Sequence, residues 1–266
     1  MQVLVCFLVL LVGALASPLA DVNERILGGT DVTRGQYPFM ISLHYCGRTS
    51  CQHACGGALI GYMWIVSAAI CLTQVPSTGY YVAIGGIVDL NDTITERQEI
   101  RISHAFIAPD FEGGAGPHDL ALFKTVTPFE LNQYIQPITL LSESETYDGT
   151  GDLIGWGSIG GIVSPIMPNT LQQATVPIIS YDDCKATLDR LFDNHTFDAE
   201  ANICAGPLNG VSNACTGDNG TPLIKDNRLI GVVSWLITPC DRVNVPTILT
   251  KLSYYRSWIL STASVL

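Results

Sequence analysis

Short apolar segments alternate with turn-forming residues along most of the chain. These segments are rich in Val, Ile, Leu, Tyr and Thr, and they cover residues 39–43, 57–67, 80–84, 100–102, 120–123, 153–156, 172–177, 229–235 and 247–249. Gly, Pro, Asn or Asp bounds them. Many short strands separated by turns are typical of an all-β sandwich or barrel, and not of alternating β and α units. The pattern therefore predicts an all-β fold.

Two segments have the pattern of a helix. Residues 181–192 follow Ser180, a good N-cap residue, with Asp183 at the third helical position. Residues 253–261 form the second helical segment and close the chain. We find no internal repeat and no compositional shift that would mark a flexible linker, so the apolar segments before the last helix belong to one β architecture or two small ones.

The N-terminus has the pattern of a secretory signal. Residues 1–16 carry no charged side chain, and the apolar run 3–12 is followed by Ala14-Leu15-Ala16. That run is shorter than the roughly 18 residues of a membrane helix, and the small residues match a signal peptidase site. We therefore interpret residues 1–16 as a signal peptide, with a core helix or strand as the alternative. No other segment is long enough for a membrane helix, so we expect a secreted protein without a membrane anchor.

Composition and charge narrow the class of protein. The chain has 266 residues, of which 47% are hydrophobic and 14% charged, and this excludes a disordered or collagen-like chain. Lys and Arg number 13 against 24 Asp and Glu, so the net charge is -11. Nucleic-acid phosphates require a basic face, and a chain this acidic argues against such a partner.

The cysteines indicate disulfides. Of nine, Cys6 lies in the signal, and the mature chain keeps Cys46, Cys51, Cys55, Cys71, Cys184, Cys204, Cys215 and Cys240. An even number in a secreted chain is typical of disulfide bonding, although eight cysteines allow 105 pairings. They are scattered and lack paired C-x-x-C ligands, so we expect no metal site and no cofactor.

Several motifs resemble the trypsin-like serine proteases of the chymotrypsin fold. Arg25 precedes Ile26-Leu27-Gly28-Gly29, which is similar to the start of a mature protease of this family. Further landmarks follow in the family's order: Cys55-Gly56-Gly57, Trp64-Ile65-Val66-Ser67-Ala68-Ala69, Asp119-Leu120-Ala121-Leu122, Gly155-Trp156-Gly157, Ser234-Trp235 and Trp258-Ile259. The resemblance divides the chain into a signal (1–16), a short propeptide (17–25) and a protease-like domain (26–266).

The resemblance implies two six-stranded antiparallel β-barrels, with a cleft between them and a C-terminal helix against the barrel. It also implies three disulfides, Cys55–Cys71, Cys184–Cys204 and Cys215–Cys240. Cys46 and Cys51 are then left to bond to each other.

Two of the three residues of the family's catalytic triad are replaced. The triad needs a Ser nucleophile, a His base and an Asp that orients the His. In this chain Ile70 occupies the position of the His, in Ala68-Ala69-Ile70-Cys71, and Asn219 occupies that of the Ser, in Gly217-Asp218-Asn219-Gly220. Only Asp119 remains. Isoleucine accepts no proton and an amide forms no acyl-enzyme, so the resemblance and these residues predict an inactive protease homologue.

Other residues could in principle replace the missing groups. His118 adjoins Asp119, but neighbouring side chains of an extended segment point in opposite directions, so it should not take the empty place. His53 matches a family position at which a His helps to hold the zymogen. We expect both to be packing or surface residues. Thr216 and Thr221 carry hydroxyls near Asn219, but no base is evident for them.

The resemblance also indicates a modified substrate pocket and a retained activation switch. Asn213 stands where trypsin has its specificity carboxylate, and Leu236 and Thr247 replace glycines at the pocket mouth, so we expect a pocket that is narrow or closed. The residues of the activation switch, Arg25, Ile26 and Asp218, are kept. Cleavage after Arg25 would bury the new Ile26 ammonium against Asp218; the alternative is that Arg25 is never cleaved.

Three Asn-x-Thr triplets begin at Asn91, Asn194 and Asn219. The first two lie in polar surroundings and are candidate glycan acceptors. We expect Asn219 to be unmodified, because Pro222 follows the triplet and the site faces the cleft.

We therefore expect a secreted, monomeric, non-catalytic serine protease homologue that binds a protein partner, which could be a protease, an inhibitor or a protease substrate. One alternative is an active secreted endopeptidase with an unrecognised nucleophile. Another is a passive or storage protein without a specific partner. Ile70 and Asn219 favour the inactive homologue over the active endopeptidase. The sequence does not distinguish a binding role from a passive one.

Overall fold

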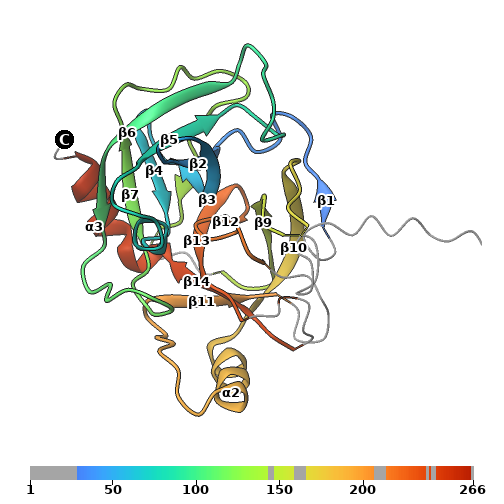
Figure 1. Ribbon diagram of the computed structural model, residues 1–266. Helices are drawn as coiled ribbons and strands as arrows, with labels where there is room; N and C mark the ends of the chain where they lie inside the picture. The colour runs from blue at the N-terminus through green and yellow to red at the C-terminus, as the bar shows by residue number, and fades with distance from the viewer. Residues whose placement is uncertain are drawn as a thin grey trace, which may run out of the picture.

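Strands that run antiparallel close into two barrels (Figure 1). The computed structural model describes residues 29–142, 147–158, 166–206, 214–237, 240 and 244–264. The predicted signal and propeptide, and the site residues Arg25, Ile26 and Asn213, lie outside the described residues. Among the described residues, no helix has the length and apolar character needed to cross a membrane.

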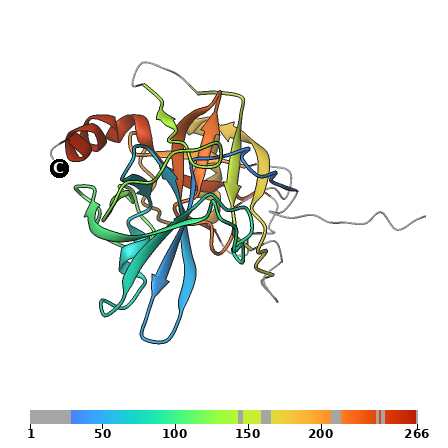
Figure 2. The ribbon, with the colours of Figure 1, turned by 90° about the horizontal axis from the view of Figure 1, so that it is seen from above.

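The first barrel is built from the N-terminal half of the described chain. Its strands are β2 (Met40–Cys46), β3 (Cys51–Leu59), β4 (Trp64–Ser67), β5 (Tyr80–Gly85), β6 (Gln98–Ile107) and β7 (Ala121–Thr125). They close in the order β2-β3-β4-β7-β6-β5. The hairpin of β2 and β3 extends beyond the rest of the barrel in Figure 2.

The second barrel follows, in yellow to red in Figure 1. Its strands are β9 (Thr150–Gly155), β10 (Gln172–Ile179), β11 (Asn202–Ala205), β12 (Pro222–Lys225), β13 (Arg228–Trp235) and β14 (Thr247–Lys251). Pairing of β9 with both β10 and β12 closes this barrel. Two short strands are added, β1 (Thr30–Asp31) on β10 and β8 (Thr139–Leu140) on β13. The expected pair of six-stranded barrels is confirmed.

The helices begin close to where the sequence predicted them. Helix α2 (Tyr181–Leu191) has Ser180 as its N-cap, whose Oγ accepts a hydrogen bond of 3.2 Å from the Asp183 backbone N–H. That bond satisfies one of the free N–H groups at the helix start. Helix α3 (Leu252–Ser264) follows β14 and lies at the edge of the molecule in Figures 1 and 2. The short helix α1 (Ile70–Thr73) was not predicted.

One predicted strand is wrong in extent. The apolar run 57–67 is divided between β3 and β4, because residues 60–63 form the connection between the two antiparallel strands. The short strands β1 and β8 were missed, as were two strands of the second barrel, β11 and β12, since each of these two has only four residues and neither alternates in polarity. Both are buried on nearly every residue, which removes the period-two signal of a half-buried strand.

The core extends across the contact between the barrels. Ala58 and Val66 from the first barrel share one buried cluster with Ile154 and Val232 from the second. Trp156 is fully buried in this cluster, and its indole N–H donates to the Val88 carbonyl at 3.0 Å. The two barrels are therefore packed on a common apolar seam, and this fixes the residues on either side of it relative to one another.

Candidate functional site

A fully buried carboxylate, Asp119, lies just before β7. Its Oδ1 accepts a hydrogen bond of 2.7 Å from the Ile70 backbone N–H, and its Oδ2 accepts one of 2.7 Å from Ser234 Oγ. Burial raises the pKa of Asp119 to about 6, although the hydrogen bonds from Ser234, Ile70 and Ala69 act in the opposite direction. The carboxyl group is thus held by hydrogen-bond donors, with a backbone N–H of Ile70 on one oxygen.

Ile70 meets this carboxylate only with its backbone. It is the first residue of α1, and its side chain is 6% exposed and belongs to the apolar core of the first barrel. An isoleucine side chain has neither a proton acceptor nor a donor. The Ile70 side chain therefore brings no polar group to the environment of Asp119.

Asn219 is tied to the second barrel by its side chain. Its Nδ2 donates to the Ser234 carbonyl at 2.5 Å, while its own carbonyl accepts a bond of 2.9 Å from the Gly56 N–H. The Gly220 N–H, next in the chain, donates to the Val233 carbonyl at 2.7 Å. These bonds hold the loop between Cys215 and β12 against both barrels. The side-chain amide of Asn219 is already used in a hydrogen bond to β13.

Ser234 brings the three positions together. Its hydroxyl donates to Asp119, and its carbonyl accepts from Asn219. Asp119 and Asn219 therefore both bond to one residue of β13, and Ile70 is linked to that residue only through Asp119. Sequence analysis used Ser234 only as part of a landmark and missed its role as the link.

The neighbouring histidines have other partners. The Nδ1 atom of His118 pairs with the Tyr255 hydroxyl, and its backbone φ of 65° lies in the left-handed region. The His53 ring pairs with Ser42 Oγ at 2.7 Å through Nδ1, and its Nε2 lies 3.4 Å from the Gly217 carbonyl. Burial, with a smaller contribution from His44, lowers the pKa of His53 to about 4. Both rings thus have packing partners, as expected, and neither is bonded to Asp119.

The hydroxyls flanking Asn219 differ in exposure. Thr216 is exposed, and its carbonyl accepts from the Ser158 N–H at 2.7 Å. Thr221 is fully buried beside Asp218. A buried hydroxyl is out of reach of a substrate, so of the two only Thr216 faces solvent.

Asp218 is a second buried carboxylate. Its Oδ1 accepts from the Gly157 N–H at 2.8 Å and its Oδ2 from the Cys215 N–H at 2.9 Å. Burial raises its pKa to about 6, and the two backbone donors act against that rise. A Cβ atom on Gly157 would lie 2.1 Å from the carboxyl carbon of Asp218. The Gly-Trp-Gly landmark is therefore explained by the close approach of this carboxylate.

Two of the three predicted pocket residues lie in the described chain. Thr247, at the start of β14, is 2% exposed, and its Oγ1 accepts a hydrogen bond of 3.1 Å from the Ala214 N–H. Leu236 is partly buried against the apolar cluster of the second barrel. The Thr247 side chain thus occupies the space beside the residue that follows Asn213.

All four expected disulfides are confirmed. They join Cys46 to Cys51, Cys55 to Cys71, Cys184 to Cys204 and Cys215 to Cys240. The second anchors α1 to β3, and the fourth anchors the Asn219 loop. Within the part of the chain that the structure describes, no three His, Cys, Asp or Glu side chains gather into a group that could hold a metal ion.

Two six-stranded barrels with a buried aspartate at their contact define the chymotrypsin fold. A model of the trypsin family matches residues 26–259, which is most of the chain. The chain therefore belongs to the trypsin family.

Known proteases resemble this chain over nearly its whole length. Kallikrein 1-related peptidase b22 of Mus musculus is 31% identical over 273 residues, with 98% of each chain covered. Trypsin-3 of Salmo salar is 32% identical over 254 residues, covering 94% of this chain and 98% of the trypsin. Coagulation factor XI of Bos taurus is 30% identical over 245 residues, but the match spans only 38% of that larger protein.

Proposed function

We propose that this protein is a secreted serine protease homologue that has lost proteolytic activity and acts by binding a protein partner. One observation carries the proposal: the site has the side chain of Ile70 and the amide of Asn219 where catalysis needs a base and a nucleophile. The partner classes that we expect are a protease, a protease inhibitor and a protease substrate, because the chain keeps the fold of the trypsin family.

The chemistry gives the expected size of the loss. A Ser hydroxyl must lose its proton to a base as it attacks, and neither Ile70 nor Asn219 supplies a step of this reaction. Removing the nucleophile or the base of a triad reduces turnover by a factor of roughly 10⁶. The remaining rate enhancement would come from backbone donors and substrate binding alone.

The environment of Asp119 also supports the proposal. In a triad the buried carboxylate stabilises the imidazolium that forms during the reaction. Here the described contacts of its side chain are hydrogen-bond donors from Ser234, Ile70 and Ala69, and none is a cation. The carboxyl group now serves to satisfy the backbone at the start of α1 and the hydroxyl of Ser234, which are structural roles.

The rest of the molecule retains what a binding surface requires. Four disulfides and the common apolar seam fix both barrels, and a fixed surface loses little entropy when it binds. The disulfides and the signal-like N-terminus support secretion. The alternative function that the relatives favour is that of an active endopeptidase. The exposed hydroxyl of Thr216 would then have to serve as the nucleophile without an evident base.

The test measures chemistry and binding separately. The purified chain, cleaved after Arg25, should hydrolyse no peptide from a mixed library and should not react with a fluorophosphonate. Stoichiometric labelling, mapped to Thr216 or any other hydroxyl, would establish the active rival instead.

For binding, the cleaved chain is immobilised and exposed to the secretion in which it occurs. The expected result is retention of a protease, an inhibitor or a protease substrate, and a change in the rate of proteolysis when the free chain is added. A matched control is the chain with Thr216→Ala, which removes the exposed hydroxyl and should retain the same partner. No retained protein and no change in proteolysis would favour the passive role.

A further inference from the structure

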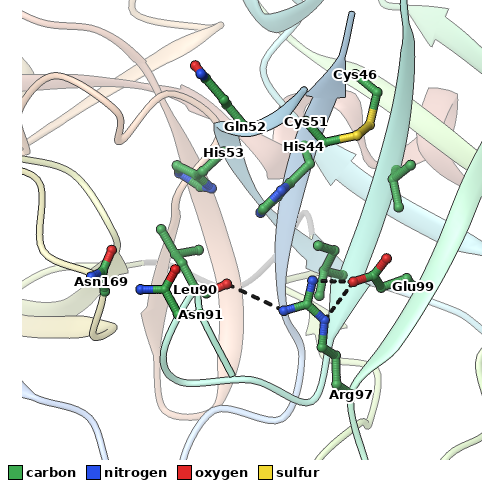
Figure 3. Close-up of a pocket in the computed structure, with 12 residues that line it drawn as sticks. His44, Cys46, Cys51, Gln52, His53, Leu90, Asn91, Arg97, Glu99 and Asn169 are labelled. Atoms are coloured by element: carbon green, nitrogen blue, oxygen red, sulfur yellow. Dashed lines mark hydrogen bonds and ion pairs between the residues drawn. A yellow bond between two sulfur atoms is a disulfide. The ribbon is translucent and has the colours of Figure 1, made fainter. Parts of the chain in front are cut away.

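A cavity of about 430 Å³ lies beside the β2–β3 hairpin (Figure 3), and neither Asp119 nor Ile70 lines it. Strands β2, β3, β5 and β6 contribute side chains to it, and the turn at Leu90 and Asn91 forms another side. Its volume is within the range of about 300–1,000 Å³ found for small-molecule sites. Nothing in the proposed function uses it.

Asn91 stands at the edge of this cavity. It is exposed, and its backbone N–H donates to Asp89 Oδ1 at 2.8 Å, which fixes the turn. Figure 3 shows its side chain on the same side of the cavity as Asn169. Asn91, Asp92 and Thr93 form an Asn-x-Thr acceptor triplet, so a group attached to this side chain would start at the cavity.

The lining has an apolar part and a polar part. Val82, Ile84 and Leu90 provide the apolar surface, while Gln52 and Asn169 provide exposed amides. Amide groups donate and accept hydrogen bonds at once, which suits hydroxyl and acetamido groups. An N-acetylated sugar has an apolar C–H face, a methyl group and a hydroxylated edge, and so it matches both parts of this lining.

The charges near the cavity are already paired. The Arg97 guanidinium contacts the Glu99 carboxylate, and its Nη1 donates to the Asp92 carbonyl at 2.7 Å. Because the cation and the anion neutralise one another, the cavity favours a neutral polar ligand over an ion.

One ring at the cavity has an unused nitrogen. The Nε2 atom of His44 is shielded from solvent and has no hydrogen-bond partner among the described residues. Figure 3 shows this ring directed towards the cavity. Burial lowers the pKa of His44, the Arg97 charge adds to this, and the Glu99 charge acts in the opposite direction. Because Nε2 is shielded from solvent, the polar contacts available to a ligand in the cavity are the exposed amides of Gln52 and Asn169.

We propose that Asn91 is glycosylated and that the first N-acetylglucosamine of its glycan packs into this cavity. The step joins the Asn91 side-chain nitrogen to C1 of the sugar; the C1–oxygen bond to a lipid diphosphate carrier breaks, the diphosphate leaves with the electron pair, and the amide loses one proton. The inference rests on the secretion proposed above, because this modification occurs on the secretory route.

The experiment uses the full chain secreted from a eukaryotic cell line. Glycan occupancy at Asn91 and at Asn194 is measured by site-resolved mass spectrometry, and the native protein is then treated with peptide N-glycosidase. Asn194 is the internal control, because it is exposed and follows α2. We expect the Asn91 glycan to be released at least tenfold more slowly than the Asn194 glycan in the native protein, and at an equal rate after denaturation.

Variants test the cavity itself. Gln52→Ala combined with Asn169→Ala should bring the Asn91 release rate to within about threefold of that at Asn194. Gln136→Ala, an exposed residue outside the lining, is the matched control and should change nothing. Thr93→Ala should abolish the glycan at Asn91 alone.

Three results would overturn the proposal: an unmodified Asn91 in the secreted chain, equal release rates at both sites, or a double variant that behaves as the control. A chain that stays inside the cells and is not found in the medium would instead contradict secretion, and with it that part of the proposed function. None of these readouts depends on catalytic activity or on a protein partner.

Discussion

Replacing Asp119 by asparagine should stabilise this protein at neutral pH. In an active triad such a substitution removes the partner of the histidine, but under the proposed function Ile70 takes the position of that histidine. The amide oxygen of an asparagine can accept from the Ile70 N–H, and its NH₂ group can donate to Ser234 Oγ, since a hydroxyl both donates and accepts. The substitution therefore removes a buried charge while it keeps the hydrogen bonds with Ile70 and Ser234.

The magnitude follows from the pKa of the carboxyl group. Burial raises it from 3.8 to about 6, which is a difference of about two pH units. Each unit corresponds to about 1.4 kcal/mol, so ionised Asp119 costs the folded state about 3 kcal/mol at pH 7. The asparagine loses the extra strength of hydrogen bonds to a charged group, and a net gain of about 1–2 kcal/mol should remain. For a domain of this size that gain corresponds to about 2–8 °C in Tm.

The effect should depend on pH with a definite sign. Because the folded pKa is raised, the folded state holds the proton of Asp119 between pH 3.8 and about 6 while the unfolded chain has released it. The stability contributed by this group is present below pH 3.8 and is lost as the pH rises through about 6. The difference between the Asp119→Asn variant and the wild type should therefore be small or negative at pH 4 and reach its full value at pH 7.

The assay is thermal and urea unfolding at pH 4, 5, 6 and 7 with the disulfides intact. The comparison must be variant against wild type, because His53, whose pKa is lowered to about 4, contributes with the opposite sign over the same range. Asp218→Asn is the contrasting variant. Both oxygens of Asp218 accept from backbone N–H groups, so an amide NH₂ there would face a donor, and this variant should be destabilised. An Asp119→Asn variant that is less stable than the wild type at pH 7 would refute the reasoning.

Three further outcomes are expected. Restoring the triad by Ile70→His with Asn219→Ser should give a weak enzyme that favours small side chains, measured as kcat/KM on a peptide panel; efficient cleavage after Arg or Phe would show an open pocket. Adding Leu236→Gly and Thr247→Gly to that variant should raise kcat/KM on larger side chains at least tenfold, or about 1.4 kcal/mol of transition-state binding. Gly157→Ala should destabilise the protein by more than about 3 kcal/mol in urea unfolding, because its Cβ would lie 2.1 Å from a buried carboxyl carbon; a change below 1 kcal/mol would mean that the loop moves freely.

Local features of this protein were predictable because their causes are local. Ser180 and Asp183 fix the start of α2 through a hydrogen bond between residues that are three positions apart. The spacing of short apolar segments indicated an all-β chain. Family resemblance supplied the pairing of the cysteines, which the 105 possible connectivities had left open. The identities of Ile70 and Asn219 are likewise visible in the sequence alone, and the identity of a side chain determines whether it can accept a proton or attack.

Tertiary structure alone decided the features that depend on distant segments. Ser234 meets Asp119 across a sequence separation of 115 residues, and closure of the second barrel needs β9 to pair with both β10 and β12. The pKa values of Asp119 and Asp218 rise because the packed barrels exclude water, a property that neither residue shows in the sequence. In the same way, the sequence marked Asn91 as an acceptor, but only the folded chain placed it at a cavity, because burial and proximity arise when separate strands pack together.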